Sequence, residues 1–241
     1  KKTVFSGAYS GRTCLHQKPS HNGKYEWLPG PGANNKFFGF AEEPVLQTVG
    51  GQTISCAAGL FKGEYTGAKT EKMTASLEIC EDAAKRPCQT TPAKEGVISE
   101  GGTLEGDLGY IDSTKKTVGW DLEHEGGSGA IFTYYCGKLP ETIHMVEGSV
   151  IGQVKPGFFG NDLNKMSKKA TISYKASKGK QLPEAFEGQP NDTLTTTTLG
   201  LETRPNEQTG LTTLLETVSG EGEDIPNEAI QEPLEVKTKE H

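Results

Sequence analysis

The sequence predicts an all-β protein: an antiparallel β-sandwich of the jelly-roll or immunoglobulin-like kind, with few short helices and with disulfide cross-links. Three observations lead to this prediction. From Gln52 onward, short runs of alternating apolar and polar residues recur roughly every ten to fifteen positions. Only 33% of the residues are hydrophobic, whereas glycine occurs 31 times. Five cysteines are spread through this weakly hydrophobic chain, where they are more useful as cross-links than as packing.

The strands are predicted from alternation and from turn residues. The segment from Glu71 to Ile79 alternates most clearly, which places Met73, Ala75, Leu77 and Ile79 on one face. Further strands are expected at Thr53–Phe61, Thr103–Ile111, Thr117–Glu123, Ala130–Cys136, Ile143–Val154, Ala170–Ala176, Leu194–Leu199, Leu211–Leu215 and Leu234–Thr238. Helical periodicity is weak, and the two best helical candidates, Glu81–Lys85 and Asn161–Met166, are short.

A hairpin is expected around residues 112–116, a polar link of suitable length between two strand patterns. It would pair residues 108–111 with residues 118–121. Trp120 and Tyr110 lie on this hairpin. They could form a sugar-stacking platform, although aromatic residues flanked by glycine in a strand are more often core residues that cover a gap beside the backbone.

The chain is expected to divide at about residue 50. Residues 1–50 are predicted to be a loop-rich arm, because seven of the eighteen aromatic residues fall in the first forty positions among turn-forming residues. These aromatics would either pack on the main domain or form a recognition patch, and packing is the simpler expectation. Residues 51–241 are expected to form the β-sandwich domain, with acidic strands in residues 200–241.

The charge and hydropathy of the chain bear on whether it binds nucleic acid or spans a membrane. The net charge is −7, and residues 200–241 alone hold ten acidic and three basic residues. Nucleic-acid binding is therefore not expected. No segment is apolar enough for a spanning helix, and the first residues do not resemble a signal core. An exported protein, extracellular or on the cell surface, would be present here in its mature form.

Four of the five cysteines are expected to form disulfides. Cys80 and Cys88 enclose a seven-residue polar loop and form the preferred pair, while Cys56 and Cys136 would form a long-range bridge. Cys14 in the arm is then left over. Other pairings remain open, because five cysteines with one left unpaired allow about fifteen patterns. No zinc site is expected, since no C-x-x-C pair exists and the histidines lack a consistent ligand spacing, apart from the group Cys14, His16 and His21.

One group of carboxylates could support chemistry. If residues 121–125 are extended, Asp121, Glu123 and Glu125 project to the same face of the sheet. Three readings are open: a solvated strand end, a calcium site built from carboxylate oxygens, or the paired carboxylates of a glycosidase. The first is the simplest, because the segment continues into a glycine-rich loop. No catalytic residue is therefore assigned, and calcium is the single cofactor considered.

Residues from about 56 to 238 resemble a group of uncharacterised, exported β-rich proteins of actinobacteria. The resemblance is carried by the segments GDLGYID (residues 106–112), VGWDL (118–122), GSVIG (148–152), NKM (164–166), GKQLPEAFEG (179–188), DTL (192–194) and PLEVK (233–237). It implies export and a β fold, and it brings no activity or catalytic motif. It does not extend to the first fifty residues.

These observations favour a secreted or surface-displayed, disulfide-linked protein that works by binding or by structural assembly. Sparse site chemistry argues against an enzyme. Self-association, or contact with another surface component, could use the arm to complete the edges of a neighbouring copy and so build oligomers or fibres. The alternative is a carbohydrate-active hydrolase or a carbohydrate-binding module that uses Asp121, Glu123 and Glu125 together with Trp120.

Overall fold

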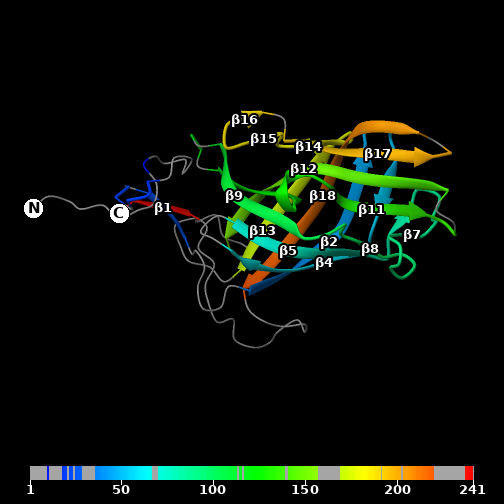
Figure 1. Ribbon diagram of the computed structural model, residues 1–241, viewed down its shortest axis with the longest axis horizontal. Helices are drawn as coiled ribbons and strands as arrows, with labels where there is room; N and C mark the ends of the chain where they lie inside the picture. The colour runs from blue at the N-terminus through cyan, green and yellow to red at the C-terminus, as the bar shows by residue number, and fades with distance from the viewer. Residues whose placement is uncertain are drawn as a thin grey trace, which may run out of the picture.

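The computed structural model describes residues 10, 18–20, 22–23, 25–28, 36–66, 70–112, 114–115, 117–138, 141–156, 169–190, 192–201, 203–219 and 237–240. These residues form an antiparallel β-structure (Figure 1), and their one helical element is a single 3₁₀ turn, η1 (Glu125–Gly127). The prediction of an all-β, antiparallel fold is therefore confirmed. No helix within the described ranges is long and apolar enough to cross a membrane.

The main sheet closes on itself. Its successive neighbours are eight strands that follow one another along the chain: β2 (Lys36–Thr48), β4 (Ala58–Tyr65), β5 (Thr70–Glu78), β9 (Leu104–Asp112), β10 (Thr117–His124), β12 (Thr142–Pro156), β13 (Lys169–Ser177) and β18 (Arg204–Ser219). The last strand pairs with the first, from Thr209 opposite Thr48 to Ser219 opposite Phe37. This closure refines the predicted sandwich into an up-and-down barrel, in which one sheet supplies every wall of the core.

A second ring of strands continues the barrel beyond the first. In its first half, β12 pairs with β11 (Ala130–Cys136) and β17 (Leu194–Gly200), and in its second half it pairs with β10 and β13. β18 likewise pairs first with β17 and then with β13. The change of partner on β12 occurs at Gly148, which has a φ of 95° and lies so close to the Thr193 carbonyl oxygen that a Cβ would be 2.1 Å from it. Only glycine fits this position.

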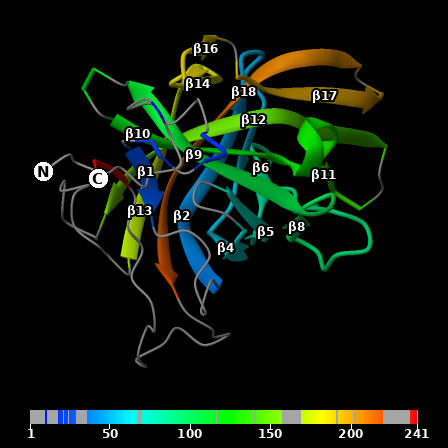
Figure 2. The same ribbon diagram turned by 60° about the vertical axis from the view of Figure 1, so that its left-hand side comes forward.

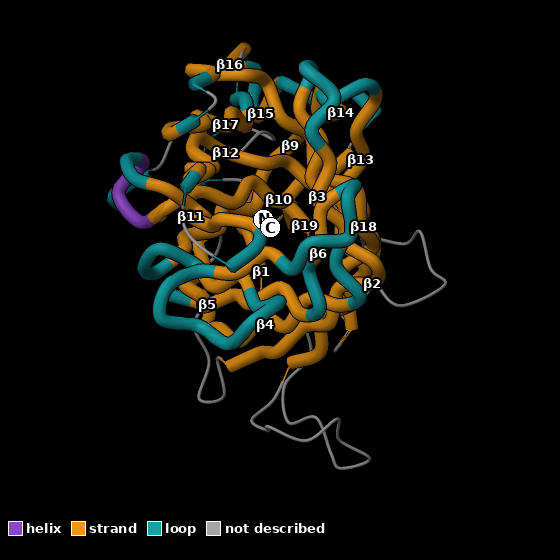
Figure 3. Tube along the Cα trace, turned by 90° about the vertical axis from the view of Figure 1, so that its right-hand side faces the viewer, coloured by secondary structure: helices purple, strands orange, loops and turns teal. Residues whose placement is uncertain are grey.

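The two rings define the two ends of the barrel. The half that contains β9, β10 and β13 is named here the aromatic end, and the half that contains β11 and β17 the apolar end. The apolar end also includes β8 (Ile98–Ser99), which pairs with β5 and connects to β11 through a bridge between Glu100 and Phe132. In Figure 1 the aromatic end lies to the left and the apolar end to the right, and Figure 3 views the molecule from the apolar end.

The other strands are short and lie at the rims or outside the barrel. β3 (Thr53–Ser55) pairs with β2 and with β6 (Glu81–Asp82), and β7 (Cys88–Gln89) pairs with β11. β14 (Lys180–Leu182) extends β13, and β15 (Ala185–Phe186) pairs with β16 (Gln189–Pro190). Two distant segments, β1 (Tyr25–Leu28) and β19 (Lys237–Glu240), form a separate pair (Figure 2).

Most predicted strands are present, and the predicted hairpin is confirmed, with Tyr110 opposite Val118 and Leu108 opposite Trp120. The helix expected at residues 81–85 is instead the short strand β6 followed by a turn. The one expected at residues 161–166 lies outside the described residues. The strand expected at residues 234–238 is seen as β19, which begins at Lys237.

The boundary predicted at residue 50 does not separate an arm from the sheet. Residues 36–48 form β2, which pairs with β4, β3 and β18 and so holds the barrel closed. Phe37 is 3% exposed in the core, whereas Phe40 is 41% exposed on the outer wall. The packing expected for the early aromatics therefore holds for Phe37, and most residues before 36 lie outside the described part of the chain.

The four cysteines expected to be oxidised do form disulfides, but the predicted pairing is wrong. Cys56 is bonded to Cys80 and Cys88 to Cys136, with Cα separations of 3.9 and 4.0 Å. Register explains the choice. Cys88 lies directly opposite Cys136. Ser55 on β3 is paired with Glu81 on β6, so Cys56, which follows Ser55, faces Cys80, which precedes Glu81. Cys14 lies outside the described residues.

Candidate functional site

The inner wall of the aromatic end carries one buried acid. Glu71 lies near the start of β5, on the same side of the strand as Met73, Ala75 and Leu77, and it is 3% exposed. The indole N–H of Trp120 donates a hydrogen bond of 2.9 Å to its Oε2. Trp120 can reach the carboxyl because Gly106 lies beside it, where a Cβ would be 2.0 Å from the indole nitrogen.

Burial strongly favours the neutral form of this acid. Transfer of the Glu71 carboxyl out of water raises its pKa well above the usual range, and the nearby Asp107 raises the pKa further. The hydrogen bond from Trp120 acts in the opposite direction and does not outweigh burial. Among the described residues, Glu71 forms no ion pair with a lysine or arginine.

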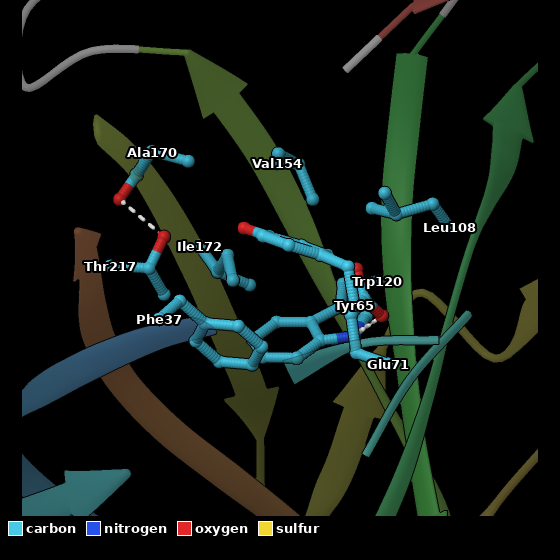
Figure 4. A pocket seen from close by; sticks show the side chains of 9 residues that line it. All are labelled: Phe37, Tyr65, Glu71, Leu108, Trp120, Val154, Ala170, Ile172 and Thr217. Carbon is cyan, nitrogen blue, oxygen red and sulfur yellow. Dashed lines mark hydrogen bonds between the residues drawn. The ribbon is translucent and has the colours of Figure 1, made fainter. Parts of the chain in front are cut away.

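Aromatic rings surround this carboxyl. The ring centroid of Phe37 lies 5.0 Å from that of Tyr65 and 6.1 Å from that of Trp120. Figure 4 shows these rings side by side, with the indole nitrogen directed at Glu71. Together they line a cavity of about 20 Å³, named here the aromatic cavity, with Leu108, Val154, Ala170, Ile172 and Thr217.

A second cavity of about 20 Å³ lies inside the apolar end. This apolar cavity is lined by side chains from both rings of strands, among them Phe61, Leu77, Leu122, Phe132, Val150 and Leu194. Beyond Leu194 on the same inner side of β17, the hydroxyl of Thr196 is hydrogen-bonded to that of Thr209 at 2.7 Å. The hydroxyl groups of these two buried threonines therefore satisfy each other's hydrogen-bonding capacity at this end of the barrel.

Tyr174 lies beside the apolar cavity and packs against Gly152. Its ring lines the apolar cavity, and its position on β13 lies next to Gly152 on β12, whose other neighbour is Trp120. A Cβ at Gly152 would be 2.9 Å from the Tyr174 ring, so the glycine makes room for it. The Tyr174 hydroxyl is buried and has no hydrogen-bond partner among the described residues. Burial, with Asp121 and Glu71 nearby, raises its pKa.

The outer wall near β9 and β10 carries a different set of acids. Asp121 lies opposite Asp107, and Glu123 lies opposite Glu105. Burial raises the pKa of Asp121 to about 7, and the nearby Asp192 and Glu123 act in the same direction, whereas a hydrogen bond with Ser149 lowers it. Burial also raises the pKa of Glu123.

The structure brings together only two of the three predicted carboxylates. Asp121 and Glu123 share the outer face of β10 as expected. Strand β10 ends at His124, one residue before Glu125, which lies in the turn η1 and forms an ion pair with Lys72. The predicted alternation therefore does not extend to Glu125. Among the described residues, no group of three or more His, Cys, Asp and Glu side chains is placed to hold a metal ion.

Trp120 does not share a site with the predicted carboxylates Asp121 and Glu123. The indole is 2% exposed and faces the interior, whereas Asp121 and Glu123 face outward. Neighbouring residues of a strand project to opposite faces. The carbohydrate site predicted from these residues would therefore have its tryptophan inside the barrel and its carboxylates outside. Trp120 instead covers Gly106, as expected of a core aromatic beside a glycine.

Sequence reasoning missed Glu71 and Tyr174 as site residues. A signal for Glu71 was present, because the alternation of Met73, Ala75 and Leu77 extends two residues back to it. Tyr174 similarly continues the inward-facing positions of Ala170 and Ile172. Nothing in the sequence shows that these residues, from strands about one hundred positions apart, approach each other inside one barrel.

No protein-family model matches this chain, and neither a curated protein nor a solved structure is significantly similar to it. The site therefore has to be interpreted from its own geometry.

Proposed function

We propose that this protein is an exported binding protein that holds a small, largely apolar ligand inside its barrel. The observation that carries the proposal is the buried hydroxyl of Tyr174, which has no hydrogen-bond partner among the described residues, on a side chain whose ring lines the apolar cavity. A buried hydroxyl without a partner costs roughly 1–3 kcal/mol, and phenylalanine would fill the same space without that cost. A ligand with one hydrogen-bonding group would satisfy the hydroxyl.

The architecture supports this function. Closed antiparallel barrels of about eight strands have interiors that are either filled by side chains or hold one small ligand. Here the interior is mostly filled, and each cavity has room for roughly one water-sized group. A ligand of several atoms would therefore need to displace a side chain such as Trp120 of the aromatic cavity or Tyr174 of the apolar cavity, which lie on either side of Gly152.

Export is part of the proposal because two disulfides form in the described residues, and disulfides persist mainly in oxidising compartments. The predicted role in assembly through the N-terminal arm stays a prediction, since most of the arm lies outside the described residues.

The proposal is tested by Tyr174→Phe, with Tyr134→Phe as the matched control, because Tyr134 is a buried tyrosine that lines neither cavity. Phenol and benzene are the probes, and the midpoint of thermal unfolding is measured. Phenol should raise the midpoint of the wild type and of Tyr134→Phe, and raise it less in Tyr174→Phe. Benzene should act equally on all three.

Without ligand, Tyr174→Phe should be more stable than the wild type, because it removes the unpaired hydroxyl. The proposal is wrong if neither probe shifts the wild-type midpoint, or if phenol acts equally on Tyr174→Phe and Tyr134→Phe.

A further inference from the structure

The aromatic cavity combines three features: a buried acid, aromatic rings beside it, and free space. Glu71 lies on the cavity wall with Phe37, Tyr65 and Trp120. These side chains come from β2, β4, β5 and β10, which are four different strands of the closed sheet. Their convergence is a product of the barrel and not of one local motif.

Among the residues that the structure describes, no lysine or arginine forms an ion pair with this acid. The indole N–H of Trp120 donates to one oxygen of Glu71, and Asp107, an acid, raises the pKa of the carboxyl further. A carboxylate removed from water is strongly destabilised unless a positive charge accompanies it. Glu71 is therefore neutral while the cavity is empty and would lose its proton to solvent when a positively charged group enters, whereas an anion would gain no such partner.

The rings add to this preference. The faces of aromatic rings are electrically negative and attract cations within about 6 Å of the ring centroid. The Phe37 ring centroid lies 5.0 Å from that of Tyr65 and 6.1 Å from that of Trp120. A cation bound beside Phe37 would therefore be close to more than one ring. Metal ions fit this setting poorly, because calcium and magnesium need several oxygen ligands and Glu71 is the single carboxylate on this wall.

We propose that the aromatic cavity binds the ammonium group of a small organic amine, with Glu71 as counter-ion and Phe37, Tyr65 and Trp120 as its aromatic wall. The inference rests on the proposed function, since it names the ligand class of the same barrel interior. The volume of about 20 Å³ suits an ammonium head. The alkyl part would then lie against Leu108, Val154 and Ile172, or displace Trp120 and Tyr174 toward the apolar cavity.

The experiment compares three probes of similar size: n-butylammonium, 1-butanol and butyrate. The chain has two tryptophans, so a Trp27→Phe background leaves Trp120 as the single tryptophan reporter. Binding is followed by Trp120 fluorescence and by the unfolding midpoint. Butylammonium should bind at least about tenfold more tightly than 1-butanol, and butyrate more weakly than both.

Two variants test the origin of this preference. Glu71→Gln should weaken butylammonium binding at least about tenfold and leave 1-butanol within about threefold. Glu64→Gln is the matched control, because Glu64 is an exposed acid on β4 at the same end of the barrel; it should leave both affinities unchanged. The preference of the wild type for butylammonium over 1-butanol tests the proposal even if Glu71→Gln does not fold.

The outcomes separate this inference from the proposed function. If phenol or 1-butanol binds inside the barrel but butylammonium binds no better than 1-butanol, the ammonium site is wrong and the binding function stands. Equal loss of butylammonium binding in Glu71→Gln and Glu64→Gln would indicate diffuse surface attraction and would also overturn the inference. If no probe binds, phenol included, both proposals fail.

Discussion

The two ends of the barrel share five strands but enclose different chemistry. β2, β4, β5, β12 and β18 run through both ends, and the exchange of β9, β10 and β13 for β8, β11 and β17 changes what the interior holds. The aromatic end contains a buried acid among rings, and the outer wall there carries further acids. The apolar end is lined by aliphatic and phenyl groups and carries both disulfides at its rim.

The difference shows that one continuous sheet can enclose a cross-linked apolar half and a half that contains buried acids. At the apolar end, burial and cross-links act in the same direction. At the aromatic end, Glu71 and Asp121 are held where their charged forms are disfavoured. Such destabilising positions are commonly found at functional sites.

The largest expected effect comes from removal of a cross-link at the apolar end. The double variant Cys88→Ala with Cys136→Ala should lose about 2–5 kcal/mol of unfolding free energy, measured with urea, because the unfolded chain is no longer constrained. Hydrogen exchange should accelerate in β7 and β11 more than in β9 and β13. Equal acceleration in all four strands would show that the two ends do not differ in local stability.

The next effect is a pH dependence that belongs to the aromatic half. Burial raises the pKa of Asp121 from its ordinary value of 3.8 to about 7 in the folded protein, so the folded state binds more protons between these two pH values. The free energy of unfolding should therefore fall as pH rises from about 4 to about 7, by on the order of 3 kcal/mol. Burial of Glu71 adds a dependence of the same sign.

Asp121→Asn should flatten this profile and make the protein more stable than the wild type at pH 8. Glu125→Gln is the control, because Lys72 lowers the pKa of exposed Glu125 and the opposite sign applies to it. A wild-type stability that rises between pH 4 and pH 7 would contradict the expected role of Asp121.

A smaller effect compares two glycines on the inner wall. In Gly106→Ala the new methyl would lie 2.0 Å from the Trp120 indole nitrogen, so the ring must move and its bond to Glu71 is lost. We expect a loss of about 1–3 kcal/mol and a shift of Trp120 fluorescence. Gly59→Ala at the apolar end meets its neighbours at 3.1 Å or more and should cost less. The reverse order would contradict the tighter packing inferred for Trp120.

The smallest effect concerns the ion pair between Lys72 and Glu125 on the outer surface. Both side chains are exposed, and exposed pairs contribute little because water screens them. Lys72→Ala should leave the urea midpoint unchanged within error and should leave phenol binding unaffected. A clear destabilisation would mean that the outer wall contributes more to the aromatic end than its inner packing suggests.

The sequence predicted the all-β class of the fold, but it did not predict that the sheet closes into a barrel. Alternation located β5, β9, β10 and β11 closely, because each has one buried face. It did not show that β2 belongs to the sheet, since its residues lie among turn-forming neighbours. Closure depends on the pairing of β18 with β2, which are separated by more than 150 positions. Local sequence patterns do not show which distant strands pair with each other.

In the candidate site, too, the features set by local alternation were predicted and those set by distant strand pairing were not. Asp121 and Glu123 were placed correctly on one face because alternation is local, whereas Glu125 was misplaced because a glycine turn interrupts it. The cysteines were identified, but their partners depend on which strands lie opposite one another. Glu71 and Trp120 meet through a hydrogen bond across 49 positions, which only the folded barrel brings about.

The row of cysteines at one rim has a consequence for the dynamics of the whole barrel. Both bridges join strands at the apolar end, so thermal opening of the described barrel should begin at the opposite rim, where strand separation meets no covalent restraint from them. A guest molecule would then exchange through that rim while the bridged half stays closed. The rate of guest release and the rate of amide exchange in β13 should rise and fall together.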